Sequence, residues 1–399
     1  MISMKGLQSS VLHIILMGVV LLLLSGSLLN ARVAPPKLPL NESAGLPGSP
    51  VNLSFVSQPD ALFADFQYRS SDDRFTCQEN GGSWRDGQCN YRGLPMPVEV
   101  CFAGTCLFNS RFYKVAQLNI LTGQSYRFVL IEAGLTNTAQ GISVFQFGVL
   151  GNEAKTSVLQ AAGGGNMNEN AIGVQLAGIF NNNKDRSYGI SAAGLVNFAG
   201  DVKGMQLTAG LNVAGRVQGA QVALFGNMAD ESAFGIQAAG LVNKVRGRLD
   251  GVQAAVLVNS VEGDVAGLQV SGLVNESAGS LTGVQLAAGG NGVDARLVGL
   301  QGAVLANYAG EMQGMQVGIA NKAHWRMKGA QIGVLNVAND QGTEKGAQIG
   351  LWNSAERKCL VQLGMINSCN GRARFQFGLL NMAKDNRIPI TILVNFDFN

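Results

Sequence analysis

The stretch GVQAAVLVN, Gly251 to Asn259, decides the fold of this 399-residue chain. It returns sixteen residues later as GLQVSGLVN and then again as GVQLAAGGN, so it is one unit of a repeat. The start of the unit alternates between apolar and polar residues with period two, which is typical of a β-strand. Frequent glycine disfavours helix. The sequence therefore predicts an all-β repeat protein.

Each unit carries a glutamine near its start and an asparagine at its end, and successive units are 14 to 17 residues apart. The central glutamines are Gln175, Gln206, Gln221, Gln237, Gln253, Gln269, Gln285 and Gln301, with Ser191 in one glutamine position. The matching asparagines are Asn181, Asn197, Asn212, Asn227, Asn243, Asn259, Asn275, Asn291 and Asn307. We expect these side chains to form structural amide ladders.

Two architectures fit strands at this spacing. In a parallel β-solenoid with one unit per coil, equivalent residues stack about 4.8 Å apart, which allows each amide to bond to its copies. The alternative is an antiparallel meander that closes into an outer-membrane β-barrel or pore, where turns and long loops alternate between opposite ends. The connections here are alike throughout, and both strand faces are only mildly apolar. The sequence favours the solenoid, although the alternating C-terminus ITILVNFDFN is typical of a closing barrel strand.

The interval from glutamine to asparagine is six residues up to Asn307 and five residues from Gln316 onward. A change of one residue reverses the side-chain face within a strand, so both amides cannot belong to one uninterrupted strand in every unit. Because asparagine tolerates left-handed backbone angles, we expect the asparagine at a corner of the coil. The array would then have two sections that join near residues 308–314.

The chain divides into four regions by composition. Residues 1–31 contain the apolar run Val11 to Leu24 and small residues after it, which predicts a signal peptide, with an uncleaved anchor as the alternative. Residues 32–50 are a linker rich in Pro, Ser and Gly, and residues 51–112 are a small cysteine-containing region. Residues 113–399 form the repeat array, with a C-terminal cap from about residue 382.

Six cysteines in a chain that carries an export signal predict disulfides. Their clustering favours the local pairs Cys77–Cys89, Cys101–Cys106 and Cys359–Cys369, although six cysteines permit other pairings and the pairing stays open. The last pair lies at the end of one connection and the start of the next. We therefore expect it to clip adjacent coils together.

Composition excludes several functions. The net charge of +3 is small and scattered, which gives no reason to expect nucleic acid as a partner. His324 is the single histidine after the signal segment, so we expect neither a catalytic residue nor a metal site nor a cofactor. The acidic residues of the connections are interspersed with Lys and Arg, which is typical of a solvated rim. Exposed aromatic residues are the best candidates for contact with a glycan or a protein: Tyr188, Tyr308, Trp325 and Trp352.

The units GIQAAGLVN (Gly235 to Asn243) and GLQVSGLVNESAGSLTG (Gly267 to Gly283) resemble those of the surface repeat-containing proteins of spirochaetes and related bacteria. So does the ending FGLLNMAKDNRIPITILVNFDF (Phe377 to Phe398). This resemblance covers residues 137–399 and implies a cell-surface or envelope location, without a catalytic residue. We expect an exported structural, adhesion or interaction protein with a protein or glycan ligand, at the cell surface or outer membrane, or else periplasmic or secreted. The alternatives are an outer-membrane pore and a β-solenoid that binds or cleaves polysaccharide.

Overall fold

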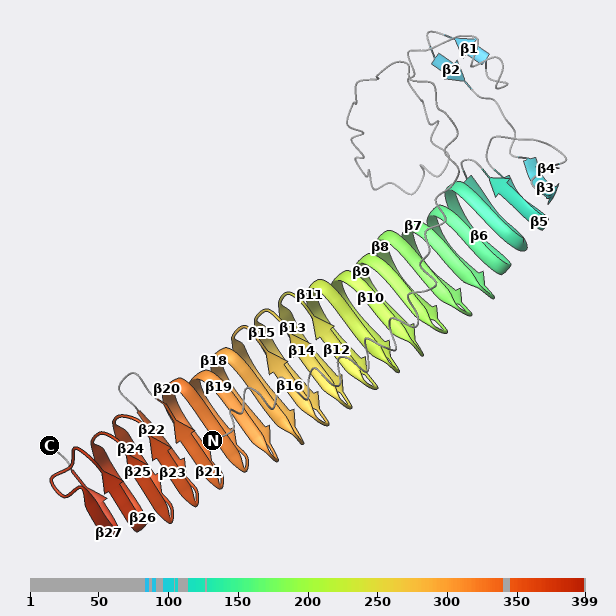
Figure 1. Ribbon diagram of the computed structural model, residues 1–399. Helices are drawn as coiled ribbons and strands as arrows, with labels where there is room; N and C mark the ends of the chain where they lie inside the picture. The colour runs from blue at the N-terminus through green and yellow to red at the C-terminus, as the bar shows by residue number, and fades with distance from the viewer. Residues whose placement is uncertain are drawn as a thin grey trace, which may run out of the picture. The chain divides into compact units, whose positions relative to one another are not determined.

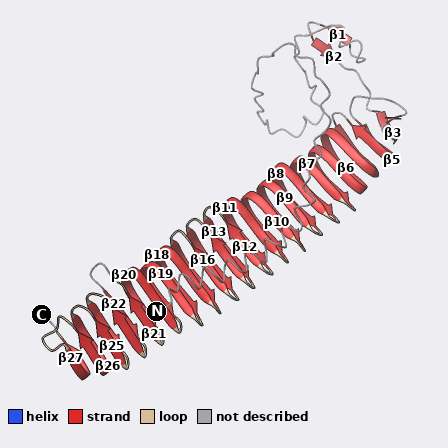
Figure 2. Ribbon diagram, viewed as in Figure 1, coloured by secondary structure: helices blue, strands red, loops and turns tan. Residues whose placement is uncertain are grey.

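The protein is all-β in the computed structural model, and its strands stack as the coils of a β-solenoid with about 18 turns (Figures 1 and 2). The structure describes residues 83–85, 88–90, 96–103, 105–106, 114–125, 128–339 and 345–397. The predicted signal peptide, the linker and Cys77 lie outside the described residues. The side chain of Cys89 does too.

The strands run in chain order as β1 (Ser83–Arg85), β2 (Gln88–Asn90), β3 (Met96–Phe102), β4 (Thr105–Cys106), β5 (Lys114–Ser125), β6 (Phe128–Ala162), β7 (Gly165–Ala177), β8 (Phe180–Ala193), β9 (Val196–Thr208), β10 (Leu211–Ala223), β11 (Gly226–Ala239), β12 (Val242–Val245), β13 (Leu249–Ala255), β14 (Val258–Val261), β15 (Val265–Ser271), β16 (Val274–Ser277), β17 (Leu281–Ala287), β18 (Gly290–Ala303), β19 (Ala306–Val317), β20 (Ala320–Ile332), β21 (Leu335–Ala338), β22 (Lys345–Ile349), β23 (Trp352–Ala355), β24 (Cys359–Leu363), β25 (Ile366–Cys369), β26 (Ala373–Ala383) and β27 (Ile390–Phe396). Several long strands continue around a corner of the coil, which explains why β6 alone contains 35 residues.

Neighbouring coils pair in parallel with equivalent residues in register. Gln253 of β13 pairs with Gln237 of β11 and with Gln269 of β15, and Asn259 of β14 pairs with Asn243 and Asn275. This confirms the parallel solenoid, and the antiparallel alternative is wrong. Antiparallel neighbours run in opposite directions, so the equivalent residues of successive units could not all lie side by side.

A central coil consists of β13, a bend at Val256 and Leu257, β14, and a second bend. Gln253 and Asn259 point inward and are fully buried, as are Leu249 and Val261 at the other side of the interior. The apolar side of the interior forms one continuous hydrophobic cluster through successive coils. Each coil thus has an interior that is part polar and part apolar.

The expectation that asparagine occupies a left-handed corner is wrong. Asn259 is the second residue of β14. Among the described non-glycine residues, only Ala103 and Leu393 have a positive φ. Positive φ belongs instead to a row of glycines two residues before the glutamine position in eleven coils, from Gly173 to Gly329, such as Gly251 of β13 with a φ of 141°. Glycine takes this position because it has no Cβ to clash with the preceding peptide.

The interval change from six residues to five is absorbed at the end of the strand that carries the glutamine. β13 continues two residues beyond Gln253 before the bend at Val256 and Leu257, whereas β22 ends one residue after Gln348, before a bend at residues 350–351. Because a bend of the same length separates the two strands in both sections, the shorter strand reverses neither amide, and Gln348 and Asn353 are buried as Gln253 and Asn259 are.

The two ends of the stack differ from its middle. At the N-terminal end β3 pairs in parallel with β5, so the ladder extends into the cysteine-containing region before residue 113. At the C-terminal end β27 runs antiparallel to β26, with Asn395 opposite Gln376. This change of direction ends the parallel stack.

Candidate functional site

Every predicted glutamine of the central array is buried, and the glutamines form a row of hydrogen bonds with one direction. Gln253 Nε2 donates to Gln237 Oε1 at 2.8 Å, and Gln269 Nε2 donates to Gln253 Oε1 at 2.9 Å. Each glutamine thus donates toward the N-terminal end of the stack. The row is interrupted where Ser191 replaces glutamine, and there Gln206 Nε2 has no partner among the described residues.

The predicted asparagines are also buried, and their row runs the opposite way. Asn259 Nδ2 donates to Asn275 Oδ1 of the next coil at 2.9 Å and also to the backbone oxygen of Val270 at 2.7 Å. Each asparagine therefore bonds both to its copy and to the backbone carbonyl beside the next bend. Because the amide dipoles of the two rows point in opposite directions, their fields largely cancel within the interior.

The glutamine row ends at a buried carboxylate near the N-terminal end. Glu132 accepts a bond from Gln146 Nε2 at 2.8 Å and one from Asn119 Nδ2 at 3.0 Å. Beyond it, the side chain of Lys114 forms a buried ion pair with Glu99. Burial raises the pKa of the Glu132 carboxyl above its ordinary value, and the two hydrogen bonds and the charge of Lys114 act against that rise.

Glu132→Gln is expected to stabilise the array at pH 8 relative to the native chain. The pKa of Glu132 is raised in the folded state, so its contribution to stability is greatest below the unfolded value of about 4.5 and is lost as pH rises through the folded pKa. A glutamine has no charge to bury, so the difference between variant and native chain should widen from pH 4 to pH 8. Urea unfolding midpoints measure this, and Glu153→Gln, at an exposed position, is the control. An equal difference at both pH values would contradict the assignment.

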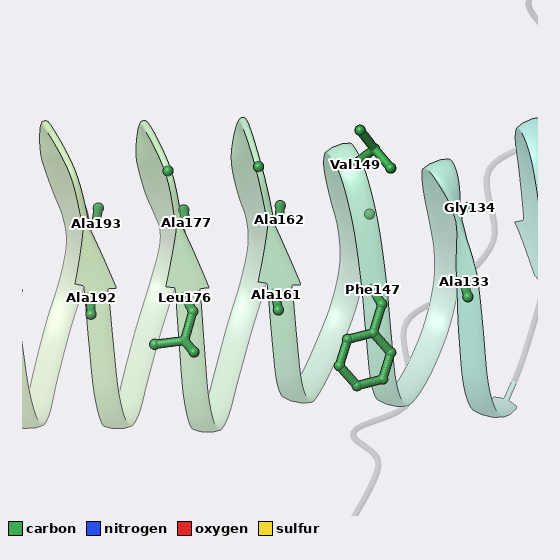
Figure 3. Close-up of a pocket in the computed structure, with 13 residues that line it drawn as sticks. Ala133, Gly134, Phe147, Val149, Ala161, Ala162, Leu176, Ala177, Ala192 and Ala193 are labelled. Carbon is green, nitrogen blue, oxygen red and sulfur yellow. The ribbon is translucent and has the colours of Figure 1, made fainter.

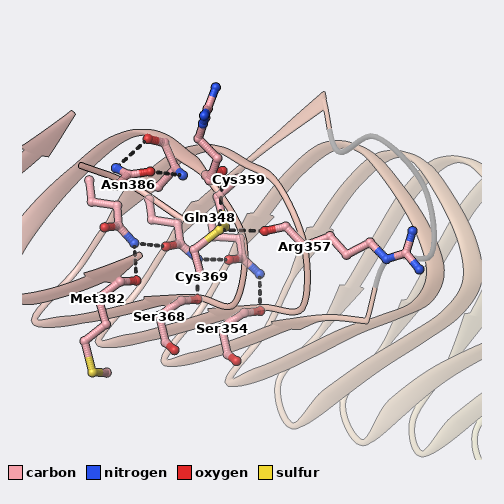
Figure 4. Close-up of a disulfide and its surroundings, with 12 residues drawn as sticks. Gln348, Ser354, Arg357, Cys359, Ser368, Cys369, Met382 and Asn386 are labelled. Carbon is pink, nitrogen blue, oxygen red and sulfur yellow. Dashed lines mark hydrogen bonds between the residues drawn. A yellow bond between two sulfur atoms is a disulfide. The ribbon is translucent and has the colours of Figure 1, made fainter. Parts of the chain in front are cut away.

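Two described cysteine pairs are disulfide bonded, Cys101–Cys106 and Cys359–Cys369. Cys359 begins β24 and Cys369 ends β25, two strands of a single coil, and both side chains are buried (Figure 4). The bond therefore closes one coil across its apolar interior, and the expectation of a clip between adjacent coils is wrong. Sequence order misled here because the end of a coil returns to lie beside its own start.

Removing the second disulfide is expected to weaken the array without changing its fold. In the adjacent coils, Ala373 pairs with Cys359 and Ala355 pairs with Cys369. The double substitution Cys359→Ala with Cys369→Ala therefore introduces the residue that already occupies the equivalent positions there. A loop of this length contributes about 2–3 kcal/mol through the unfolded state. Urea unfolding with and without reductant measures the loss. A double variant as stable as the oxidised native chain would contradict this role.

The bends on one side of the coils carry paired charges, which we call the charged edge. Arg216 lies 3.0 Å from Asp201 and 3.3 Å from Glu231, and Arg296 lies 2.9 Å from Glu311. Because opposite charges occupy successive coils, they compensate one another along the edge. Exposed pairs of this kind add little stability, so their main effect is to keep this side hydrated and nearly neutral.

A second surface is free of charge, and we call it the apolar face. It consists of the outward residues on either side of each glutamine, the bend that follows, and the residue before the asparagine where that residue is exposed, as Trp352 is and Val258 is not. Over sixteen coils from Gln146 to Gln376 every one of these positions is apolar or glycine. The most exposed members include Leu224 at 61%, Val256 at 61%, Val304 at 60% and Leu351 at 54%. Single exposed apolar residues are ordinary, but a continuous apolar strip along a whole structure is not.

The apolar face is uneven along its length. One hollow lies near the N-terminal end between Phe147, Val149 and Leu176, over a floor of alanine and glycine from successive coils (Figure 3). Another lies where Gly302 separates Leu286 from Val317. Both hollows follow from small residues beside larger ones in the same rows.

Three aromatic rings gather at the Asn-strand side of the array. The ring of His324 lies 6.5 Å from that of Tyr308 and 5.6 Å from that of Trp325, between centroids. Burial, followed by the charge of Asp294, raises the pKa of Tyr308 and also that of Glu276. The charge of Asp294 therefore acts on both Glu276 and Tyr308, and these residues form a polar cluster beside the three rings.

One described group of residues has the chemistry of metal ligands, namely Glu99 with Cys101 and Cys106. Its two sulfurs are joined to each other, and Glu99 is paired with Lys114. The ligand atoms of this group are thus already used in a disulfide and an ion pair.

The sequence predicted the amide rows but missed the apolar face. The signal was present, because no charged residue stands directly beside any glutamine of the array. Alanine, valine and glutamine mix along each strand, however, and the two faces of the strand separate only when the inward direction of glutamine is known. Comparisons with known protein families, curated proteins and solved structures find no match for the chain. No helix of the described residues has the length and hydropathy needed to cross a membrane.

Proposed function

We propose that this chain is an exported bacterial repeat protein of the cell surface or envelope, with a structural, adhesive or interaction role. The observation that carries the proposal is the disulfide between Cys359 and Cys369 inside a coil of the array. Disulfides of this kind persist in oxidising compartments, outside the cytosol. The sequence supports export independently through the apolar run from Val11 to Leu24.

The arrangement of polar residues supports a structural role. Inside the coils the amides bond to one another and to the backbone, as Asn259 does with Asn275 and Val270. On the charged edge the carboxylates pair with arginines. Polar groups committed in this way stiffen a stack of coils, and repeat proteins use such stacks to present long surfaces.

The aromatic cluster of Tyr308, His324 and Trp325, with Glu276 and Asp294 beside it, is the surface at which a protein or glycan ligand would bind. Aromatic faces and carboxylates are suited to the apolar faces and hydroxyls of sugars. The resemblance to spirochaete-type surface repeat proteins supports the same location.

Fractionation of cells that express the native chain tests this function. The envelope or surface fraction should contain the protein, and a maleimide reagent added without reductant should leave Cys359 and Cys369 unmodified after unfolding. Prior reduction should make both cysteines reactive. A cytoplasmic protein whose two cysteines react without reduction would contradict the proposal.

A further inference from the structure

The apolar face has the properties of a surface that meets hydrocarbon. In the coil of Gln253 its outward members are Val252, Ala254, Val256 and Leu257. The backbone groups of these strands bond to the neighbouring coils in the parallel ladder, so the face presents few free donors or acceptors. Protein–protein interfaces are on average about 56–65% apolar and carry a polar rim with hydrogen bonds. A surface without either suits a solvent that forms no hydrogen bonds.

The occupant must also be long and flat. The face continues through sixteen coils, which at about 4.8 Å per coil is roughly 75 Å. Its boundary falls at the same position in every coil, while the charged edge with Arg216 and Arg296 follows a separate bend of the coil. A boundary repeated in this way runs along the whole stack, so one side of the array can lie on the surface of a lipid leaflet.

Lipid fits this face better than a second copy of the chain. A rigid partner would leave the hollows at Phe147 and at Gly302 unfilled, and unfilled voids forfeit packing energy. Fluid acyl chains can enter them.

The sequence that precedes the described array also favours lipid as the occupant of the apolar face. The run from Val11 to Leu24 would bring the N-terminus to a membrane as a signal or as an anchor. About seventy residues then separate it from β3, which is long enough to leave the array free to lie along the same bilayer.

We propose that the apolar face lies in the hydrocarbon boundary of one phospholipid leaflet, with the charged edge in water. The array would then bind as an amphipathic helix does, in the plane of the interface and without crossing it. This deepens the proposed function and rests on it for the identity of the membrane in the cell, whereas binding to lipid vesicles does not depend on that location.

Two native tryptophans allow a test in the full chain, since Trp352 belongs to the apolar face and Trp325 lies in the aromatic cluster next to Arg326 and the charged edge. Trp84→Phe with Trp325→Phe leaves Trp352 as the reporter, and Trp84→Phe with Trp352→Phe leaves Trp325. With phosphatidylcholine vesicles that contain brominated acyl chains, Trp352 should lose about half of its emission and shift to the blue, because such faces enter the leaflet by several ångströms. Trp325 should remain almost unchanged.

Each other outcome overturns the proposal. If the chain binds vesicles with neither tryptophan quenched, the N-terminal segment alone holds it. Equal quenching of both would show insertion without a preferred face. A chain that ignores vesicles and forms a dimer with Trp352 shielded would show that the face covers a second copy.

A charge placed on the face provides a second measurement. Leu351→Glu should weaken vesicle binding about tenfold, because a carboxylate in hydrocarbon is costly. Ser354→Glu, in the same coil on the side of the Asn strand, is the matched control and should bind as the native chain does. Equal affinities for both variants would contradict the proposal. An envelope protein without lipid contact would sink this inference alone, and lipid binding by a cytoplasmic protein would sink the proposed function alone.

Discussion

Gly251→Ala is expected to destabilise the array by about 3 kcal/mol or more, because the residue has a backbone conformation that side chains rarely adopt. Its φ is 141°, and a Cβ built there would lie 2.0 Å from the carbonyl oxygen of Gly235 in the preceding coil. That oxygen belongs to backbone held in the parallel ladder, so it cannot move without breaking inter-coil bonds. Urea unfolding followed by circular dichroism measures the loss.

Gly292→Ala is the matched control for this substitution. Gly292 lies in β18, where a Cβ would meet nothing within 4 Å and φ is not in the left-handed region. Alanine there should leave stability unchanged or raise it by up to about 1 kcal/mol, since it restricts the unfolded chain. Equal destabilisation by both variants would show that the glycine row is not a steric requirement of the stacking.

Asn259→Leu is expected to cost about 3–6 kcal/mol, because it strands several buried groups at once. Asn275 Oδ1 and the backbone oxygen of Val270 lose a donor, and Asn243 Nδ2 loses an acceptor. Each unsatisfied buried group costs about 1–3 kcal/mol, and leucine offers no replacement. Free energies of unfolding from urea titration measure this.

Two comparisons sharpen that measurement. Gln253→Leu should cost less than Asn259→Leu, because Gln253 bonds only to its copies while Asn259 also holds a backbone carbonyl. Ser260→Ala, outside the same coil, should change stability by less than about 0.5 kcal/mol. If Asn259→Leu proved as mild as Ser260→Ala, the asparagine row would have no structural role.

The repeat itself favoured the parallel solenoid over the antiparallel barrel. Gln253 and Asn259 recur at a nearly constant interval, and only a parallel stack with one unit per coil brings each residue next to its copies. The same reasoning could not show which way an amide points. A ladder of glutamines forms equally well inside or outside a coil, and the inward direction follows only from the complete packing of residues such as Leu249 and Val261.

The corner residue shows a different limit of the sequence. Asparagine and glycine both tolerate positive φ, and the pattern predicted the asparagine, such as Asn259, at a left-handed corner, whereas Gly251 has the positive φ. Steric contact between coils decides between them, because Gly251 approaches the backbone of Gly235 too closely for any side chain. That contact exists only once the coils are stacked. The sequence could not show that the Cys359–Cys369 bond lies within one coil for the same reason, because the path of the coil is defined only in the folded stack.

The most direct test of the account is the rise per repeat unit, measured as distances between pairs of spin labels on the outer side of the Asn strands. Labels at Ser260 and Lys322 lie at equivalent positions four coils apart, and labels at Ser260 and Ser354 lie six coils apart. Stacking at about 4.8 Å per coil predicts distances near 19 and 29 Å, in proportion to the number of coils. Distances that do not increase with the number of intervening units would contradict the parallel solenoid and the faces that depend on it.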